Sequence, residues 1–473
     1  MSLLTMKFGG TSVGSVEALT QAADIVLEQV QHWDGVAVVV SAMSGVTDAL
    51  TQGALTAASG DASTYQNIVS ELRTRHDATI DALLNPDGER TLLLATVDQL
   101  LGDFSAFCHS VHVLGEVTPR AMDAIVSVGE RINARVLAAL LRQKGVRSQA
   151  VDATELIVTD DTFQNAAPIL DETRVQAGSR LAPLLADGVV PVITGFIGAT
   201  REGKITTLGR GGSDFSAAVL GAALDADEVW IWTDVDGVMT ANPRIVPEAQ
   251  VIPLLSYGEV GELAYFGAKV LHPRTIRPVV ERGIPLWVKN TFNPACPGTR
   301  ITREAKQTNG AVKSVTAIEG LSTVTVEGRG MIGVPGIAAR TFAAVASQGA
   351  SVLMISQASS EQSICFVIPT PAVPAVVQAI EKEMTLELTR RDVDRVWSQD
   401  RVVIVTAVGA GMRETPGIAA RIFGALGQAR INVIAIAQGS SECSVSVVVS
   451  ADDAAMAVRQ IHQQVILASS PGA

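Results

Sequence analysis

An internal repeat in the C-terminal part of the chain sets the strongest limit on its fold. The hexapeptide Pro-Gly-Ile-Ala-Ala-Arg occurs at residues 335–340 and again at 416–421, and later residues, such as Gln357 and Gln438, repeat at the same offset of 81 without a gap. Each copy is expected to run strand, turn, helix, strand, turn, strand, helix. Because this period is far above that of solenoid repeats, the repeat predicts two folded α+β modules rather than an extended array.

The chain before residue 300 has a different pattern, in which short apolar runs alternate with helical segments. The runs are continuous rather than alternating in polarity, which is typical of strands covered on both faces. They occupy residues 36–40, 189–194, 229–232 and 284–288. Segments such as 120–144 keep apolar residues at helical spacing and stop at a glycine. This alternation predicts an α/β fold with a mainly parallel sheet.

Composition limits the classes of partner. A chain of 473 residues predicts two to four domains. Lys and Arg number 36 against 48 Asp and Glu, so neither nucleic acid nor an anionic membrane is expected as the main partner, because both require a basic face. The four cysteines form no CxxC pair, and no metal site built from Cys and His is expected. With no signal-peptide pattern and no uninterrupted apolar stretch of membrane-spanning length, a cytoplasmic protein is expected.

The glycine pair after the first predicted strand, in Lys7-Phe8-Gly9-Gly10, is one candidate anion site. Adjacent glycines let backbone N–H groups approach an anion closely, and the start of the following helix adds its dipole. Lys7 could then reach phosphate oxygens. Taken alone, such residues more often form a tight turn beside a solvated lysine.

A second glycine-rich turn, Gly209-Arg210-Gly211-Gly212-Ser213-Asp214, also leads into a helix. Arg210 could bind a carboxylate through two parallel hydrogen bonds, and Asp214 could either take part in a reaction or cap the helix. Two such turns could form two halves of one site, one for each substrate. No GxxxxGK[ST] motif occurs, so a P-loop nucleotide site is excluded.

Two later segments could complete such a site. Residues 233–237, Thr-Asp-Val-Asp-Gly, follow a strand end, where two acids could approach Mg²⁺, although an Asp-Gly turn without function is commoner. Residues 266–273 contain Lys269, which could face Lys7 and stabilise a phosphoryl group in transfer, and His272, which is expected to be structural. A carboxylate acceptor would need no general base, because it is already ionised at neutral pH.

Three further polar residues are candidates. Ser41 and Thr47 follow a strand end and offer hydroxyl groups to a ligand. Glu130 lies off the apolar stripe of its helix, beside a glycine that would permit close approach. Without further information, Glu130 would be interpreted as an ordinary surface acid.

Taken together and in order, these motifs closely resemble those of aspartate kinases in the amino acid kinase family, and the resemblance covers nearly the whole chain. The repeated half resembles the tandem ACT modules of these enzymes. Its Pro-Gly-Ile-Ala-Ala-Arg and Ala-Gln-Gly-Ser-Ser-Glu segments are similar to the kinase portion of threonine-sensitive aspartokinase–homoserine dehydrogenases. Because the chain stops at Ala473, no dehydrogenase half is expected.

The resemblance implies a definite domain organisation. Residues 1–300 would form a three-layer αβα sandwich with a mainly parallel sheet, the amino acid kinase fold. Two α+β ACT modules would follow at 320–398 and 399–473. Residues 301–319 would be a linker and a strand, near 312–318, that joins the second module and makes it discontinuous.

The resemblance also implies phosphoryl transfer from ATP, with Mg²⁺, to the β-carboxylate of L-aspartate. Lys7, Asp214 and Lys269 would be catalytic, with Asp214 orienting the two lysines. The aspartate pocket would be lined by Thr11, Ser12, Ser41, Thr47, Glu130, Arg210 and Ser213, with Arg210 on the α-carboxylate and Glu130 on the α-ammonium. Contacts to ATP would come from Lys7, Gly9, Gly10, Thr233, Asp234, Met239, Arg244, Lys269 and Val270. Met239 stands where the family usually has Tyr.

Regulation is implied as well. The ACT modules would pair across a homodimer and bind an amino acid effector, threonine by preference, with lysine also open. Gln357 and Gln438, equivalent in the repeat, resemble the threonine-contacting glutamines of the bifunctional enzymes, and could otherwise be polar residues at strand ends.

Other functions remain open at this point. A relative acting on glutamate or carbamate is disfavoured by the ACT pair and by Glu130 with Arg210, which match an α-amino acid. A catalytically silent amino-acid sensor on the same fold predicts loss of Lys7, Lys269 or Asp214, and all three are present. An ATP-binding structural protein leaves the two ACT copies unexplained.

Overall fold

The first two strands of the computed structural model, β1 (Leu3–Phe8) and β2 (Gly35–Val40), are buried along their whole length. They pair in parallel within an eight-stranded sheet of order β3-β5-β2-β1-β8-β10-β11-β9. Its other strands are β3 (Ser148–Val151), β5 (Val190–Thr194), β8 (Glu228–Thr233), β9 (Leu254–Ser256), β10 (Leu286–Asn290) and β11 (Thr299–Thr302). In this sheet, the neighbouring strands β3, β5, β2, β1, β8 and β10 all pair in parallel, and β11 pairs antiparallel with β10. The predicted mainly parallel sheet is therefore confirmed.

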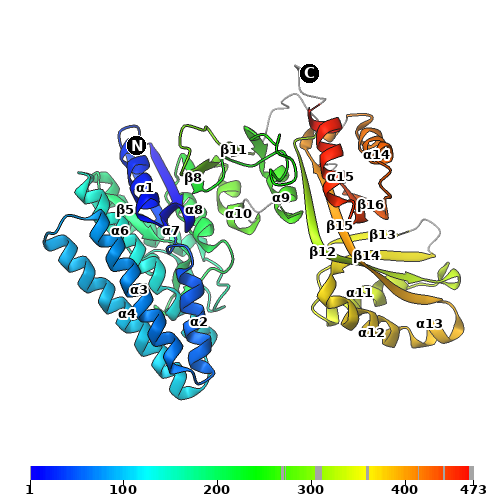
Figure 1. Ribbon diagram of the computed structural model, residues 1–473, viewed down its shortest axis with the longest axis horizontal. Coiled ribbons are helices and arrows are strands. Elements are labelled where there is room, and N and C mark those ends of the chain that lie inside the picture. Colours follow the sequence, from blue (N-terminus) through cyan, green and yellow to red (C-terminus); the bar gives the residue numbers. More distant parts are fainter. Residues whose placement is uncertain are drawn as a thin grey trace. The chain divides into compact units, whose positions relative to one another are not determined.

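Helices cover both faces of this sheet (Figure 1). The face that carries Leu4, Met6 and Phe8 packs on α1 (Val16–Gln29) and α6 (Val128–Gln143). On the other face, α8 (Gly212–Ala223) lies so close to β1 and β8 that a Cβ at Gly221 would come within 2.5 Å of the Val229 side chain. The helices α7 (Leu170–Ala186) and α10 (Pro273–Arg282) pack against α8. This is the predicted three-layer arrangement.

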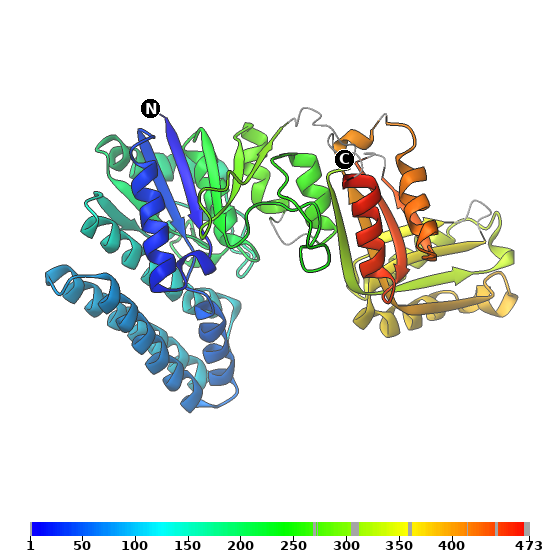
Figure 2. The same ribbon diagram turned by 45° about the horizontal axis from the view of Figure 1, so that its top comes forward.

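Three helices extend from the sheet as a bundle (Figure 2), namely α2 (Val46–Ala58), α3 (Ala62–Leu83) and α4 (Gly88–Leu114). Within the described residues, α4 alone is long and apolar enough to cross a membrane by length and composition. The core helix of a soluble protein passes the same test, and α4 buries a stripe that includes Leu101 and Phe104 in the core of its unit. The connection to the sheet continues through α5 (Pro119–Val126).

The structure describes residues 2–267, 271, 273–303, 312–357, 362–413, 415–439 and 443–467. The chain divides into two compact units. The N-terminal unit contains the eight-stranded sheet and comprises Met1–Val238, Pro253–Tyr257 and Val270–Glu304. The C-terminal unit comprises Met239–Ile252, Gly258–Lys269 and Ala305–Ala473.

A six-stranded antiparallel sheet forms the centre of the C-terminal unit, in the order β13-β14-β12-β15-β17-β16. The two central strands, β12 (Ser314–Glu327) and β15 (Arg395–Val408), are long and each serves both modules. The part of β12 at 321–327 pairs with β14 (Ser363–Pro369). The part at 314–318 pairs with residues 404–408 of β15, next to β17 (Ser444–Ser450). The segment 314–318 therefore lies in the sheet of the second copy.

The repeat in the sequence is a repeat in the structure. The helix α11 (Ile337–Ser347) corresponds to α14 (Ile418–Gln428), and the edge strand β13 (Met354–Gln357) corresponds to β16 (Ala435–Gln438). A second helix closes each copy, α12 (Val373–Glu383) in the first and α15 (Ala454–Ile461) in the second.

Two segments from within the predicted domain 1–300 pack with the C-terminal unit instead. In residues 239–252, Ala241 and Val246 join the apolar core of the second copy. Most of α9 (Tyr257–Tyr265) follows the same course, because the fully buried Glu259 forms an ion pair with Lys313 at 3.0 Å. The division of the chain is thus set by contacts between residues that are distant in sequence.

Candidate active site

A pocket of about 700 Å³ lies in the N-terminal unit, beside the carboxyl ends of β1 and β2. Three stretches of chain form most of its wall: the turn after β2, the α5–α6 region, and the glycine-rich turn before α8. The predicted residues in the lining are Lys7, Gly10, Ser41, Thr47, Glu130, Arg210, Ser213 and Asp214. The structure therefore brings the two glycine-rich turns to one cavity, at the edge where open α/β sheets place their ligands.

The glycines after β1 leave room for the Lys7 side chain. A Cβ at Gly9 would lie 3.3 Å from the Lys7 Nζ, and one at Gly10 would lie 3.2 Å from the carbonyl oxygen of Ala42. Lys7 is buried, and its Nζ lies 2.6 Å from the Asp214 Oδ1. Asp214 thus holds a buried cation at the mouth of the first glycine turn.

Glu130 is buried, with 3% of its surface exposed, so its interpretation as a surface acid is wrong. Gly129 lets α6 approach the turn after β2, since a Cβ there would lie 2.8 Å from the Ala42 Cβ. The Ala42 N–H donates to the Glu130 Oε1 at 3.2 Å, whereas the Oε2 has no hydrogen-bond partner among the described residues. Burial raises the pKa of Glu130 to about 8, against the Ala42 hydrogen bond, which lowers it.

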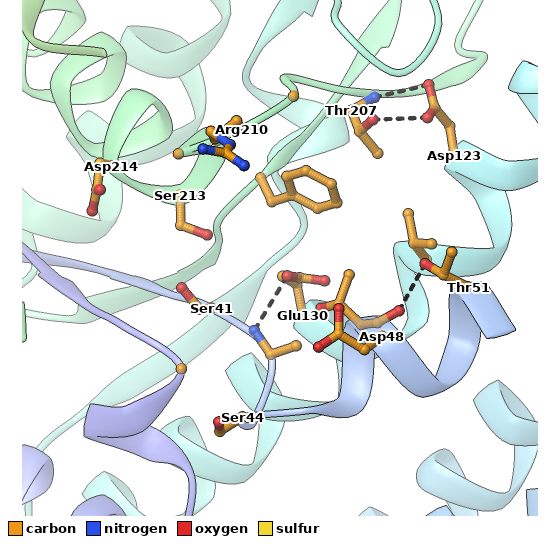
Figure 3. Close-up of a pocket in the computed structure, with 18 of the residues that line it drawn as sticks. Ser41, Ser44, Asp48, Thr51, Asp123, Glu130, Thr207, Arg210, Ser213 and Asp214 are labelled. Carbon is orange, nitrogen blue, oxygen red and sulfur yellow. Dashed lines mark hydrogen bonds between the residues drawn. The ribbon is translucent and has the colours of Figure 1, made fainter. Parts of the chain in front are cut away.

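Arg210 lies on the glycine-rich turn before α8, between Gly209 and Gly211, which both adopt positive φ angles, 75° and 71°. Its side chain is exposed and has no ion-pair partner among the residues that the structure describes. Figure 3 shows Arg210 and Ser213 on one side of the pocket, and Glu130 and Asp48 on the other. A ligand with both a carboxylate and an ammonium group matches this separation of charge.

Several lining residues have no motif in the sequence. Asp48 at the start of α2 adds a second acid near Glu130, and Phe196 and Gln164 contribute from loops. Asp123 of α5 is fully buried and accepts hydrogen bonds from the backbone N–H and the hydroxyl of Thr207 (Figure 3). The sequence did contain one indication of this, because Asp123 lies within the apolar stripe of α5. An acid at such a position is expected to be buried only if it has partners.

Some predicted residues lie elsewhere. Thr11 and Ser12 are absent from the lining of this pocket. The Ser12 hydroxyl is buried, where it donates to the Trp232 carbonyl and accepts from the Thr291 hydroxyl at 2.7 Å. The Ser12 hydroxyl therefore connects Trp232 of β8 with Thr291, the residue after β10, and does not line the pocket.

The predicted nucleotide contacts are described only in part. Thr233 is the last residue of β8 in the N-terminal unit and Asp234 follows it, and the Thr233 hydroxyl donates to the Asp234 Oδ1 at 3.2 Å. Met239 and Arg244 belong to the C-terminal unit. Lys269, Val270 and His272 lie outside the described residues. Within the described part of the chain, no group of three His, Cys, Asp or Glu side chains could hold a metal ion.

Two smaller pockets contain the predicted effector residues. Gln357 lines a pocket of about 360 Å³ with residues 333–338, and Gln438 lines one of about 340 Å³ with residues 415–419. The two pockets occupy equivalent places in the repeat, each at the start of a helix, α11 or α14.

Comparison with known proteins shows which families have this domain organisation. Residues 3–290 match the model of the amino acid kinase family, and residues 324–384 and 405–465 each match an ACT domain. The chain is 40% identical, over 98% of its length, to bifunctional aspartokinase/homoserine dehydrogenase 1 of Arabidopsis thaliana, but covers only 51% of that protein. It is 32% identical to aspartokinase 1 of the same plant, covering 97% of this chain and 79% of that one.

The structure resembles crystal structures of aspartokinases. Two structures of E. coli aspartokinase III, one with aspartate and ADP and one with lysine and aspartate, match with a TM-score of 0.79 and 29% identity, over 98% of this chain and 99% of theirs. The chain therefore belongs to the amino acid kinase family, in its aspartokinase branch with tandem ACT domains. It spans about half the length of the bifunctional relatives that it matches.

Proposed function

We propose that this protein is an aspartate kinase, which transfers the γ-phosphoryl group of ATP to the β-carboxylate of L-aspartate. The observation that carries the proposal is that one pocket contains both the buried Glu130 carboxylate, whose Oε2 has no hydrogen-bond partner among the described residues, and the exposed Arg210 guanidinium, which has no ion-pair partner among them. An α-amino acid satisfies both, through its ammonium and its carboxylate. The known aspartate and ADP complex of the structurally similar E. coli enzyme supports the same pair of ligands.

The transfer needs charge stabilisation and positioning rather than a base. A β-carboxylate oxygen attacks the γ-phosphorus, the bond to the β,γ-bridging oxygen breaks, and ADP leaves with the electron pair. Lys7, fixed by Asp214 at 2.6 Å, would neutralise charge that develops on the phosphoryl oxygens. The backbone N–H of Gly10 would hold a phosphate, whereas the N–H of Gly9 already donates to the Trp232 carbonyl at 3.1 Å, so the predicted phosphate contact of Gly9 would not come from its N–H.

Mg²⁺ fits this site as a companion of the nucleotide. Because the described residues offer no cluster of three acidic or Cys/His ligands and Asp214 already pairs with Lys7, the ion would be held chiefly by phosphate oxygens and water. When bound, it would reduce repulsion between the phosphates and the attacking carboxylate.

The test is the capture of the acyl phosphate by hydroxylamine, with ATP, Mg²⁺ and L-aspartate. Aspartyl hydroxamate should form, and none should form with D-aspartate or without ATP. Formation with L-glutamate in place of L-aspartate would point to a relative with another substrate. No hydroxamate with either acid, combined with amino acid binding in calorimetry, would favour the silent sensor.

We further propose feedback control by an amino acid, threonine in the first place, through the pockets at Gln357 and Gln438. The resemblance of the repeated segments to threonine-sensitive aspartokinase–homoserine dehydrogenases supports threonine, whereas the lysine complex of E. coli aspartokinase III keeps lysine as the alternative. The same assay with added threonine or lysine distinguishes the two. A place in the biosynthesis of lysine, threonine and methionine and a cytoplasmic location follow as proposals.

A further inference from the structure

Two residues in the lining of the active-site pocket adopt a backbone conformation that side chains other than glycine seldom take. Gln164 has a φ of 69° and Phe196 a φ of 68°. Six such residues other than glycine are found in the described part of the chain, and these two share one pocket. Strained backbone of this kind persists only where the surroundings over-determine it, and it collects at functional sites.

The surroundings of Gln164 include a dedicated partner. The Asp123 carboxylate, fully buried, accepts the Gln164 N–H at 2.9 Å from the Oδ2 and 3.2 Å from the Oδ1. The same carboxylate accepts the Thr207 N–H at 3.0 Å and the Thr207 hydroxyl at 2.7 Å. One side chain of α5 thus fixes two segments that lie 41 and 84 residues further along the chain.

Both fixed segments lead to the pocket wall that carries Arg210. The Ala166 N–H donates to the Thr207 carbonyl at 2.9 Å, which joins the loop of Gln164 to the end of the strand at 205–207. A Cβ at Gly209 would lie 2.8 Å from the Asn165 Oδ1. The loop of Gln164 therefore packs against Gly209, the residue that directly precedes Arg210.

The Gln164 side chain is free to meet a ligand. It lines the pocket, and its amide makes no hydrogen bond with any residue that the structure describes. Four acids belong to the lining. Asp123 accepts from three donor groups and Asp214 pairs with Lys7, so their charges are compensated within the protein. The two remaining acids, Glu130 and Asp48, carry less compensation. A carboxylate of a bound ligand is repelled from those acids, so it should turn toward the donors, Arg210 and Gln164.

We infer that Gln164 is a specificity-determining residue of the amino acid pocket, whose amide donates a hydrogen bond to a substrate carboxylate, and that Asp123 is the positioning residue that holds it there. This inference rests on the proposed aspartate kinase function. A purely structural role for Asp123 would not require a residue with a side chain to hold this positive φ angle at the pocket lining, where glycine would be unstrained.

The first experiment compares Gln164→Gly and Gln164→Asn with the wild type. Glycine relieves the strain, so Gln164→Gly should fold with an equal or higher melting temperature. It should nevertheless raise the KM for aspartate about tenfold and leave the KM for ATP within about twofold, because a hydrogen bond to a charged group is lost. Asparagine tolerates this backbone conformation and keeps an amide on a shorter side chain. The KM for aspartate of Gln164→Asn should therefore lie between those of the wild type and Gln164→Gly.

Arg430→Gly is the matched control, since Arg430 has a φ of 57° and lies after α14 in the C-terminal unit. It should relieve the same kind of strain without a change in the KM for aspartate. An unchanged KM in Gln164→Gly, or the same rise in Arg430→Gly, would overturn the role of Gln164.

A double-mutant cycle tests Asp123. Asp123→Asn should raise the KM for aspartate about tenfold in the wild type and by a smaller factor in the Gln164→Gly background, because the part of its effect that passes through the Gln164 side chain is lost there and only the part that passes through Thr207 remains. Equal effects in both backgrounds would contradict the positioning role. Turnover of aspartate by the wild type tests the proposed function separately, and calorimetric binding of aspartate to the same variants tests this inference even if turnover is absent.

Discussion

Glu130 is an acid placed where water solvates it poorly. Its side chain is buried, and the Oε2 has no partner in the described part of the chain. A substrate ammonium would fill that vacancy, so Glu130→Ala is expected to raise the KM for aspartate by about 100-fold and to leave the KM for ATP within about twofold. Steady-state kinetics with each substrate varied measures both. The exposed Glu116→Ala serves as the control, and equal changes in both constants would remove Glu130 from the ammonium site.

The same residue makes stability depend on pH. Its folded pKa, about 8, is above the ordinary value of 4.5, so the folded state binds the extra proton between these pH values. The contribution to stability is present below pH 4.5 and is lost as the pH rises toward 8. From pH 5 to pH 8, Glu130→Gln should gain on the order of 5 °C in melting temperature relative to the wild type. Parallel curves for the two proteins in a thermal shift series would contradict this.

Motifs made Lys7, Arg210 and Asp214 predictable, because a glycine-rich turn that leads into a helix has a known use. Asp123 could not be found in this way. Its partners lie 41 and 84 residues further along the chain, and a strained φ angle leaves no mark in a sequence. Residues such as Asp123 were missed because their contacts depend on the tertiary structure and not on a local sequence motif.

The helices α11 and α14 begin at equivalent pockets, and this equivalence allows a matched test of regulation. Gln357→Ala should raise the threonine concentration for half-inhibition at least tenfold, since the pocket loses its hydrogen-bonding side chain. Uninhibited activity should be unchanged, because Gln357 lies in the C-terminal unit. Gln438→Ala, measured in parallel, reports on the second pocket. Full sensitivity to both threonine and lysine in each variant would exclude these pockets as effector sites.

The helix α9 is held in the C-terminal unit by a buried charge. The Glu259 Oε2 pairs with the Lys313 Nζ at 3.0 Å, and its Oε1 accepts the Ala410 N–H at 2.8 Å. Lys313→Met removes the ion pair that this buried acid makes with Lys313 and should cost about 3 kcal/mol of stability. Arg329→Met removes a largely exposed ion pair of the same unit and should cost less than about 1 kcal/mol. Equal denaturation midpoints for the two variants would contradict the ranking.

The two copies in the C-terminal unit were predictable as repeats because both carry a full set of elements. The assignment of residues 239–252 and of α9 to that unit was not, because both segments read as ordinary continuations of the α/β pattern. Their destination depends on Ala241, Val246 and Glu259, which find partners more than fifty residues away. The local sequence pattern determines where helices and strands form. Burial against residues that are distant in sequence determines which of the two units each helix or strand joins.

Association of two copies is the last property that the C-terminal sheet allows us to argue. Its edge strands, β13 and β16, carry Ile355 and Ile436, which are 49% and 47% exposed and occupy equivalent positions of the repeat. Exposed apolar residues on edge strands favour pairing with a second chain, and equivalent patches favour a symmetric dimer.

The double variant Ile355→Lys/Ile436→Lys is therefore expected to raise the dimer dissociation constant at least tenfold, because two lysines would meet like charges across the interface. Sedimentation velocity over a range of protein concentrations measures this directly. Leu92→Lys, at a residue of α4 that is 70% exposed in the N-terminal unit, should leave association unchanged. A double variant that dimerises like the wild type would place the interface away from these edges, and a wild type that stays monomeric with and without threonine would contradict the dimer itself.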